Sequence, residues 1–143
     1  MLRAAQRQDA PALAEILRQW IDETPYMPRL HTAAADRAFV SYLIADHHVL
    51  VSGGETPTGW IARKDQVISH LFLAPDARGR GLGSAMIDAM KARRDLLSLW
   101  CFQANVAARR FYTREGFVEI ATTDGADNTE KLPDVKLEWR RQA

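Results

Sequence analysis

The sequence predicts an α/β (α+β) fold, with a mixed central sheet of about seven strands flanked by about four helices. Two observations carry this prediction. Short runs typical of strands alternate along the chain with segments whose apolar residues recur every three and four positions, as on one helix face. The order is one strand, two helices, three strands, a helix, a strand, a helix and two strands, which suits a sheet with helices on its faces.

The first half of the chain begins with a short strand candidate at Leu2–Ala5. Asp9 is expected to cap a helix with a proline in its first turn, and Pro25 and Pro28 close it. Its apolar face consists of Leu13, Ile16, Leu17, Trp20 and Ile21. A second helix is predicted from about Thr32 to Ile44.

Three strands should follow, at Val49–Ser52, Gly59–Arg63 and Val67–Leu73. The first ends at Gly53-Gly54, and a tight turn at Asp65-Gln66 joins the second to the third.

The second half continues with a helix whose apolar face is Leu82, Ala85, Met86, Ala89 and Met90. The dense apolar run Leu96–Phe102 predicts a buried central strand. Asn105 should cap a helix that ends at Gly116. Phe117–Thr123 and Val135–Trp139 are the last two strand candidates, joined by a polar loop.

The size and composition favour one domain over residues 1–143, since the chain is 47% hydrophobic and 26% charged. The single cysteine, Cys101, excludes an internal disulfide and suits a reducing compartment. No apolar run approaches the ~20 residues of a membrane span, and the first ten residues lack the apolar stretch of a secretion signal. We therefore expect a soluble cytoplasmic protein.

The net charge of +1 conceals two opposed blocks. Residues 78–114 carry 8 basic and 2 acidic groups, whereas residues 115–138 carry 2 basic and 7 acidic groups. The first block suits a polyanionic ligand. The second is either an ordinary solvated loop or a surface that attracts cationic amines.

Three alternate glycines connect the third central strand to the following helix, at Gly79, Gly81 and Gly83. Glycines let the backbone approach a ligand, and the amides of a first helical turn form an anion site. Arg78 and Arg80 would strengthen it, so a pyrophosphate is the expected ligand. The P-loop lysine and the dinucleotide-binding glycine spacing are both missing. The alternative is a plain glycine-rich turn.

Two motifs resemble those of one family. Arg78-Gly79-Arg80-Gly81-Leu82-Gly83 resembles the acyl-CoA-binding motif Arg/Gln-x-x-Gly-x-Gly/Ala of the GNAT superfamily of N-acyltransferases. The segment from Asn105 to Phe117 resembles the GNAT signature Asn-x-x-Ala-x-x-Phe-Tyr-x-x-x-Gly-Phe at every fixed position. The resemblance covers nearly the whole chain, although the first 60 residues share only its organisation.

The resemblance implies an N-acetyltransferase that moves an acetyl group from acetyl-CoA to a primary amine of a small molecule, peptide or protein. The amine would attack the thioester directly, and no metal is expected. In GNAT enzymes two neighbouring parallel strands splay apart and acetyl-CoA lies between them. In this chain those strands would be Val67–Leu73 and Leu96–Phe102.

The resemblance also implies roles for individual residues. The backbone near Leu73 would polarise the thioester carbonyl, and Tyr112 would protonate the leaving thiolate. The alternative for Tyr112 is a core aromatic with a satisfied hydroxyl. The expected cofactor-binding set is Leu71, Phe72, Leu73, Arg78, Gly79, Arg80, Gly81, Leu82, Gly83, Ser84, Asn105 and Tyr112.

The group that deprotonates the amine is open. Some relatives carry a glutamate five residues before the asparagine, where this chain has Trp100. His70 on the cofactor strand is the candidate base, with Glu130 and Asp134 as alternatives. The segment Trp20–Leu30 either lines the acceptor pocket or is a plain connection.

Other functions remain open at the level of sequence. A non-catalytic CoA-binding regulatory module on the same fold is the alternative, and a protein whose basic block binds RNA is a weaker one. We expect no nucleic-acid or membrane partner, and a homodimer is left open. The acceptor cannot be read from the residues.

Overall fold

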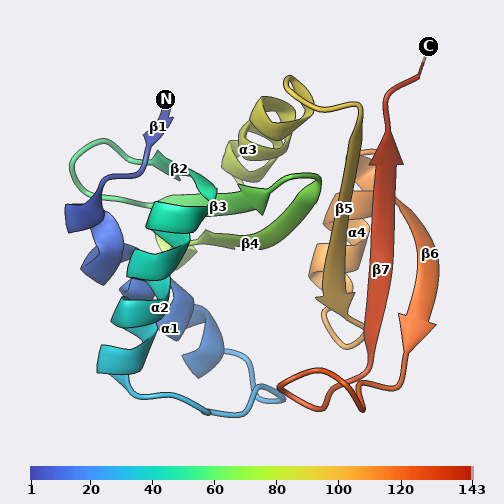
Figure 1. Ribbon diagram of the computed structural model, residues 1–143, viewed down its shortest axis with the longest axis horizontal. Coiled ribbons are helices and arrows are strands. Elements are labelled where there is room, and N and C mark those ends of the chain that lie inside the picture. Colours follow the sequence, from blue (N-terminus) through green and yellow to red (C-terminus); the bar gives the residue numbers. More distant parts are fainter. Residues whose placement is uncertain (143) are drawn as a thin grey trace.

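The computed structural model describes residues 1–142 and holds one seven-stranded sheet in the order β1-β2-β3-β4-β5-β7-β6 (Figure 1). The strands are β1 (Leu2–Ala4), β2 (His48–Ser52), β3 (Gly59–Lys64), β4 (Val67–Leu73), β5 (Leu96–Phe102), β6 (Val118–Thr123) and β7 (Asp134–Arg140). The helices are α1 (Ala10–Asp22), α2 (Ala33–Asp46), α3 (Leu82–Lys91) and α4 (Val106–Arg114), with short 3-10 turns η1 (Arg7–Asp9) and η2 (Pro75–Ala77). The predicted fold class is confirmed.

Strands β4 and β5 form the parallel pair of the sheet, and they separate soon after they meet. Their pairing is recorded at Val67 and Ser98, whereas β5 pairs with β7 along its whole length from Leu96 to Phe102. Figure 1 shows β2, β3 and β4 running across the view while β5, β6 and β7 stand upright. The predicted splay of two central parallel strands is therefore present.

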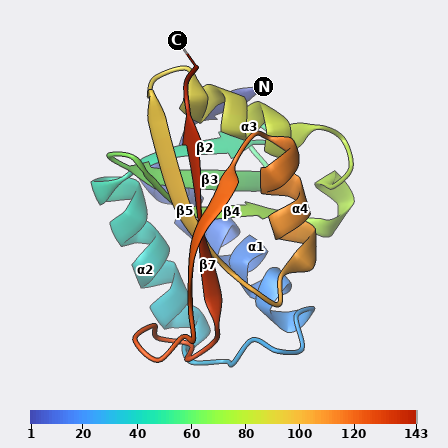
Figure 2. The same cartoon turned by 90° about the vertical axis from the view of Figure 1, so that its right-hand side faces the viewer.

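Each face of the sheet has its own apolar core. Under α1 and α2 it includes Leu13, Val40 and Trp60, whose indole Nε1 donates to the Leu13 carbonyl at 3.1 Å. Under α3 and α4 it includes Met86 and Leu97. In Figure 2, α2 and α4 lie on opposite sides of the upright β5 and β7.

One extra residue in β4 decides which core each of its side chains enters. Ala62 pairs with His70 and Arg63 with Ile68, so Ser69 has no partner in β3 and forms a β-bulge. As a result Ile68 and Leu71, three residues apart, both pack on the α3–α4 side. His70 lies on the α1–α2 side, where its ring stacks on Trp60 at 5.6 Å.

The four predicted helices are confirmed, and side chains cap two of them. Asn105 accepts from the Ala108 amide at 3.2 Å, and Thr32 caps α2 in the same way. Asp9 is the N-cap residue of α1, as expected, but its side chain makes no capping hydrogen bond, because its carboxylate accepts from Arg3 and from the Gln6 amide instead. Within residues 1–142, no helix combines the length and hydropathy needed to cross a membrane.

Candidate functional site

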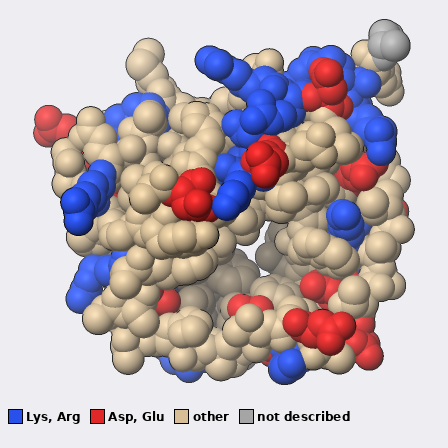
Figure 3. Space-filling view, viewed as in Figure 1, with Lys and Arg blue, Asp and Glu red and all other residues tan. Residues whose placement is uncertain are grey.

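A cavity of about 620 Å³ opens where β4 and β5 diverge. Strand residues 68–72 and 99–102 form two of its walls, and it brings together His70, Asn105 and Tyr112. The α1–α2 end of this cavity is lined by helical residues and by residues 129 and 130. Figure 3 shows the molecule hollowed between the two halves of the sheet.

Tyr112 lies at the strand end of the cavity with its ring in the α3–α4 core. It is 9% exposed, and Phe111 and Phe117 pack edge-on against it at 5.1 and 5.6 Å. Burial raises the pKa of the phenol above its ordinary value, so the hydroxyl keeps its proton at neutral pH. No described residue hydrogen-bonds this hydroxyl, which leaves its proton free for a ligand.

Phe111, the neighbour of Tyr112 in α4, is less deeply buried than Tyr112. Phe111 packs against Gly83, where an added Cβ would lie 3.1 Å from its ring. The close approach of α3 to α4 therefore depends on the small size of Gly83.

His70 lines the cavity as a neutral aromatic ring. It stacks on Trp60, meets Phe39 edge-on at 5.5 Å, and its Nδ1 lies 2.9 Å from the Ser69 hydroxyl. Burial, aided by the nearby His47, lowers the pKa of the imidazole to about 4. Such a group is uncharged at pH 7 and is a weak proton acceptor there.

The glycine turn before α3 presents unpaired amides to open space. Gly79 and Gly81 adopt φ of +74° and +80°, and no atom lies within 4 Å of an added Cβ at either position. Gly81 is the N-cap of α3 and accepts from the Ala85 amide at 3.0 Å. The amides of residues 82–84 therefore have no acceptor within the helix, which suits an anion.

The two arginines of this turn are placed differently. Arg78 donates to the Leu73 carbonyl from Nε at 3.2 Å and from Nη2 at 3.0 Å, and it pairs with Glu23 at the end of α1. Arg80 is exposed and makes no ion pair with residues 1–142. The free positive charge beside the glycines therefore belongs to Arg80.

The edge of β4 that faces the gap has unpaired backbone groups. The Ala74 amide donates to Thr58 on the β3 side, and backbone groups alternate in direction along a strand. Leu71 and Leu73 therefore direct their amides toward the gap, where no pair with β5 follows the one at Val67. An extended ligand could add to this edge as a further strand.

Helices α1 and α2 and the segment between them form the other end of the cavity. Trp20, Ile21 and Met27 line it, within the segment Trp20–Leu30 for which the sequence left open a pocket wall or a plain connection. Phe39 from α2 also lines it and was not foreseen, although Ala35 and Phe39 share one helix face. The signal in the sequence was an aromatic residue, Phe39, four positions after Ala35 and therefore on the same helix face.

Only one of the two acidic residues considered as alternative bases lines the main cavity. Glu130 lines the cavity. Asp134 lies in a neighbouring hollow, where it accepts hydrogen bonds from Thr123 and Asn128. The sequence placed both in one polar loop and offered no means to choose.

Comparison with known proteins identifies the family. A family model described as the acetyltransferase (GNAT) domain matches residues 39–119, which include both motifs. The chain belongs to the GNAT acetyltransferase family. The resemblance read from the sequence is thus confirmed, and the protein is an acetyl-CoA-dependent N-acetyltransferase.

Individual relatives match over the full length. The peptidyl-lysine N-acetyltransferase YiaC of Escherichia coli (strain K12) is 26% identical, over 97% of this chain and 96% of the relative. The solution structure of apo YjaB from Escherichia coli has a TM-score of 0.81 at 20% identity, covering 99% and 98% of the two chains. The structure of yncA from Salmonella typhimurium with acetyl-CoA has a TM-score of 0.73 at 16% identity, covering 100% and 94%. Both solved structures share the fold of this chain.

Proposed function

We propose that residues 1–143 form one domain that acetylates the ε-amino group of lysine in a peptide or protein. The observation that carries this acceptor is the apolar wall at the α1–α2 end of the cavity, made by Trp20, Ile21 and Phe39. A lysine side chain has a four-carbon apolar stem that gains by packing on such a wall. The name of the relative YiaC, which matches nearly the whole chain, supports the same acceptor.

Acetyl-CoA would lie along the strand end of the cavity. Its pantetheine arm would pair with the free backbone edge from Leu71 to Leu73, and its pyrophosphate would accept from the amides of residues 79–84. Asn105 uses its side-chain oxygen to cap α4, so its amide nitrogen is available to the cofactor arm.

In the proposed reaction the lysine amine forms a bond to the thioester carbon and the carbon–sulfur bond breaks. Tyr112 donates its proton to the leaving thiolate and regains one from the nitrogen. An alkyl ammonium with pKa ~10.4 must first lose a proton to solvent to be nucleophilic. Because the pKa of His70 is about 4, we assign His70 to the acceptor wall rather than to the base.

The test measures release of free thiol from acetyl-CoA with three acceptors. One is a peptide with a blocked N-terminus and one lysine, the second has a free N-terminus and no lysine, and the third is a simple alkyl amine. We expect turnover with the lysine peptide to exceed the others by at least tenfold. Turnover confined to the free N-terminus would contradict the proposed acceptor.

A further inference from the structure

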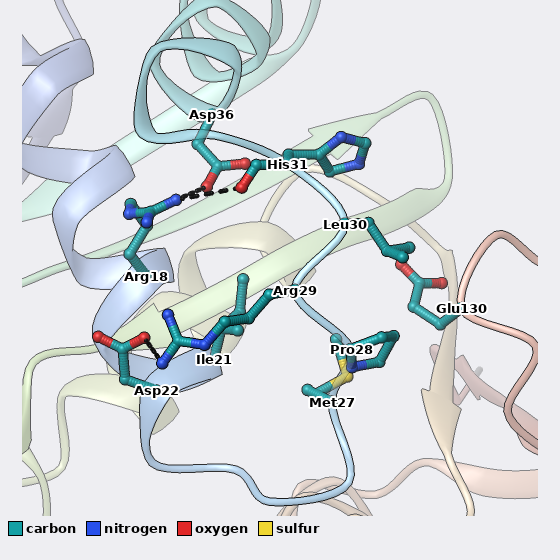
Figure 4. A pocket seen from close by; sticks show the side chains of 10 residues that line it. All are labelled: Arg18, Ile21, Asp22, Met27, Pro28, Arg29, Leu30, His31, Asp36 and Glu130. Atoms are coloured by element: carbon teal, nitrogen blue, oxygen red, sulfur yellow. Dashed lines mark hydrogen bonds and ion pairs between the residues drawn. The ribbon is translucent and has the colours of Figure 1, made fainter.

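Two carboxylates line the α1–α2 end of the cavity, and only one of them is neutralised. Asp36 is buried and its Oδ2 lies 2.7 Å from the Arg18 Nη1. Glu130 is half-buried and has no ion-pair partner among residues 1–142. Figure 4 shows the joined pairs Arg18–Asp36 and Asp22–Arg29, with Glu130 standing apart from both, near Leu30.

Glu130 stands where three hollows meet. It lines the main cavity, the small hollow of Figure 4, and a third hollow that includes Asp127 and Asp134. Neither of the two outer hollows includes Tyr112 or His70. Glu130 therefore marks the mouth of the main cavity, away from the reacting end.

The turn that carries Glu130 is fixed by contacts within the loop between β6 and β7. Asn128 accepts from the Leu132 amide at 3.2 Å and donates to its carbonyl at 2.7 Å. The Lys131 ammonium donates to the Ala126 carbonyl at 2.6 Å. Gly125 packs so closely on Leu132 that no side chain fits there. The backbone position of Glu130 is thus set before any ligand arrives, which lowers the entropy lost on binding.

Resting on the proposed function, we propose that Glu130 binds a second positive charge on the acceptor, so that the enzyme prefers a lysine with a basic residue beside it. The reacting amine must reach Tyr112, so the chain that bears it passes the mouth where Glu130 stands. A half-buried, uncompensated carboxylate gains a charge-assisted hydrogen bond from a guanidinium or ammonium there. The preference belongs to acceptor binding and leaves acetyl-CoA binding unchanged.

The experiment compares two peptides with blocked N-termini and one lysine each, differing in an arginine or a glutamine next to the lysine. We expect wild-type kcat/KM to favour the arginine peptide by about fivefold, mainly through KM, as befits a partly exposed ion pair. Glu130→Gln should bring the ratio near one, and Glu130→Lys should reverse it. The control Asp127→Asn removes the same charge from the same loop, outside the main cavity, and should keep the wild-type ratio.

Each of the remaining experimental outcomes would overturn a specific part of the proposal. Equal ratios in wild type and Glu130→Gln, with both peptides acetylated, overturn the role of Glu130 and leave lysine acetylation standing. An equal loss of kcat for both peptides with a shifted pH profile makes Glu130 the base and also overturns its role in recognition. Failure of wild type to acetylate either peptide overturns the proposed function and this inference with it.

Discussion

At the scale of single residues, Tyr112 combines deep burial with a hydroxyl that finds no partner in the described chain. The hydroxyl is not among the fully buried side-chain atoms that lack a partner, so it reaches the cavity that Tyr112 lines. The adjacent Phe111 and nearby Phe117 show that this core accepts phenylalanine. A tyrosine at this place therefore fits the proposed role toward a ligand in the cavity.

Replacing Tyr112 with phenylalanine should lower kcat by ~10-fold or more and leave CoA affinity within about twofold of wild type. The fold should survive because no hydrogen bond to the protein is removed. Single-turnover kinetics and calorimetry with CoA make the two measurements. An unchanged single-turnover rate would remove Tyr112 from the acid role.

His70 should make the protein less stable as the pH falls from about 6.5 to 4. Its folded pKa of about 4 lies below the unfolded value, so the unfolded chain binds the proton first and stability rises with pH. The full effect is roughly 3 kcal/mol. His70→Phe keeps a ring on Trp60 and removes the titration, so its unfolding free energy should vary less with pH. Equal slopes for both proteins in urea titrations would contradict the burial of His70.

The sequence alone did not show on which face of β4 each side chain of the site lies. A strand alternates its side chains with a period of two, and from that rule Ile68 and Leu71 belong on opposite faces. The bulge at Ser69 places them on one face, and no local sequence pattern predicts a bulge. The motif residues Asn105 and Tyr112 could be singled out because the segment that holds them resembles the GNAT signature at every fixed position.

At the scale of elements, the proposed anion site consists of the first turn of α3 and the two left-handed glycines before it. Gly81→Ala should weaken CoA binding by at least fivefold, because the new methyl group enters the open space before the unpaired amides. Gly54→Ala is the matched control, with φ of +66° and equally open space far from the cavity. Both should lose about 1–2 kcal/mol of stability. Equal CoA affinity in the two variants would contradict the assignment of this turn to CoA binding.

The loop between β6 and β7 is a second element, to which we assign acceptor binding. Gly125→Ala should raise the KM of the acceptor several-fold and leave CoA affinity unchanged, since Leu132 must move and carries the Glu130 turn with it. Gly53→Ala meets a similar collision in the β2–β3 loop and serves as the control for general destabilisation. A rise in acceptor KM of the same size in both variants would show that the loop has no special role.

Most elements could be predicted because each has its own signal, such as the cap at Asn105 or the glycine at position 116. Asp9 shows the limit of such signals. A short acidic residue before a proline fits a helix cap, but a nearby Arg3 offers two charge-assisted hydrogen bonds and takes the carboxylate instead. Tertiary partners of this kind are invisible to a local pattern.

At the scale of the whole molecule, the two halves of the sheet meet along a short parallel contact at Val67 and Ser98. A ligand in the gap should therefore bridge them. CoA at 100 times its dissociation constant should stabilise the protein by about 2.7 kcal/mol. In hydrogen exchange the amides of Leu71 and Leu73 should gain protection, with those of β2 as the internal control. Protection that spares Leu71 and Leu73 would place CoA elsewhere.

The structure distributes the two charge blocks of the sequence differently from what their order along the chain suggests. Lys91, Arg93 and Arg94 belong to the basic block of the sequence, but they lie at the C-terminal end of α3, opposite the glycine turn. Arg109 is paired with Glu119 at 2.8 Å. Of the seven acidic residues of the second block, only Asp124, Asp127 and Glu130 lie in the loop between β6 and β7, with Asp134 at the start of β7. Acidic side chains gather at the lower right of Figure 3. Net charge along the chain thus overstated both sides, since Glu119 and Glu138 are paired with arginines.

The bulge at Ser69 has a consequence for how this gene can change. Deleting Ser69 would remove the unpaired residue, so Ile68 and His70 would become neighbours and each remaining residue of β4 would keep its β3 partner and its face. Deleting a paired residue such as Leu71 would instead change the register and exchange the faces of its neighbours. A mutational library should therefore tolerate an in-frame deletion at the Ser69 codon better than one at the Leu71 codon.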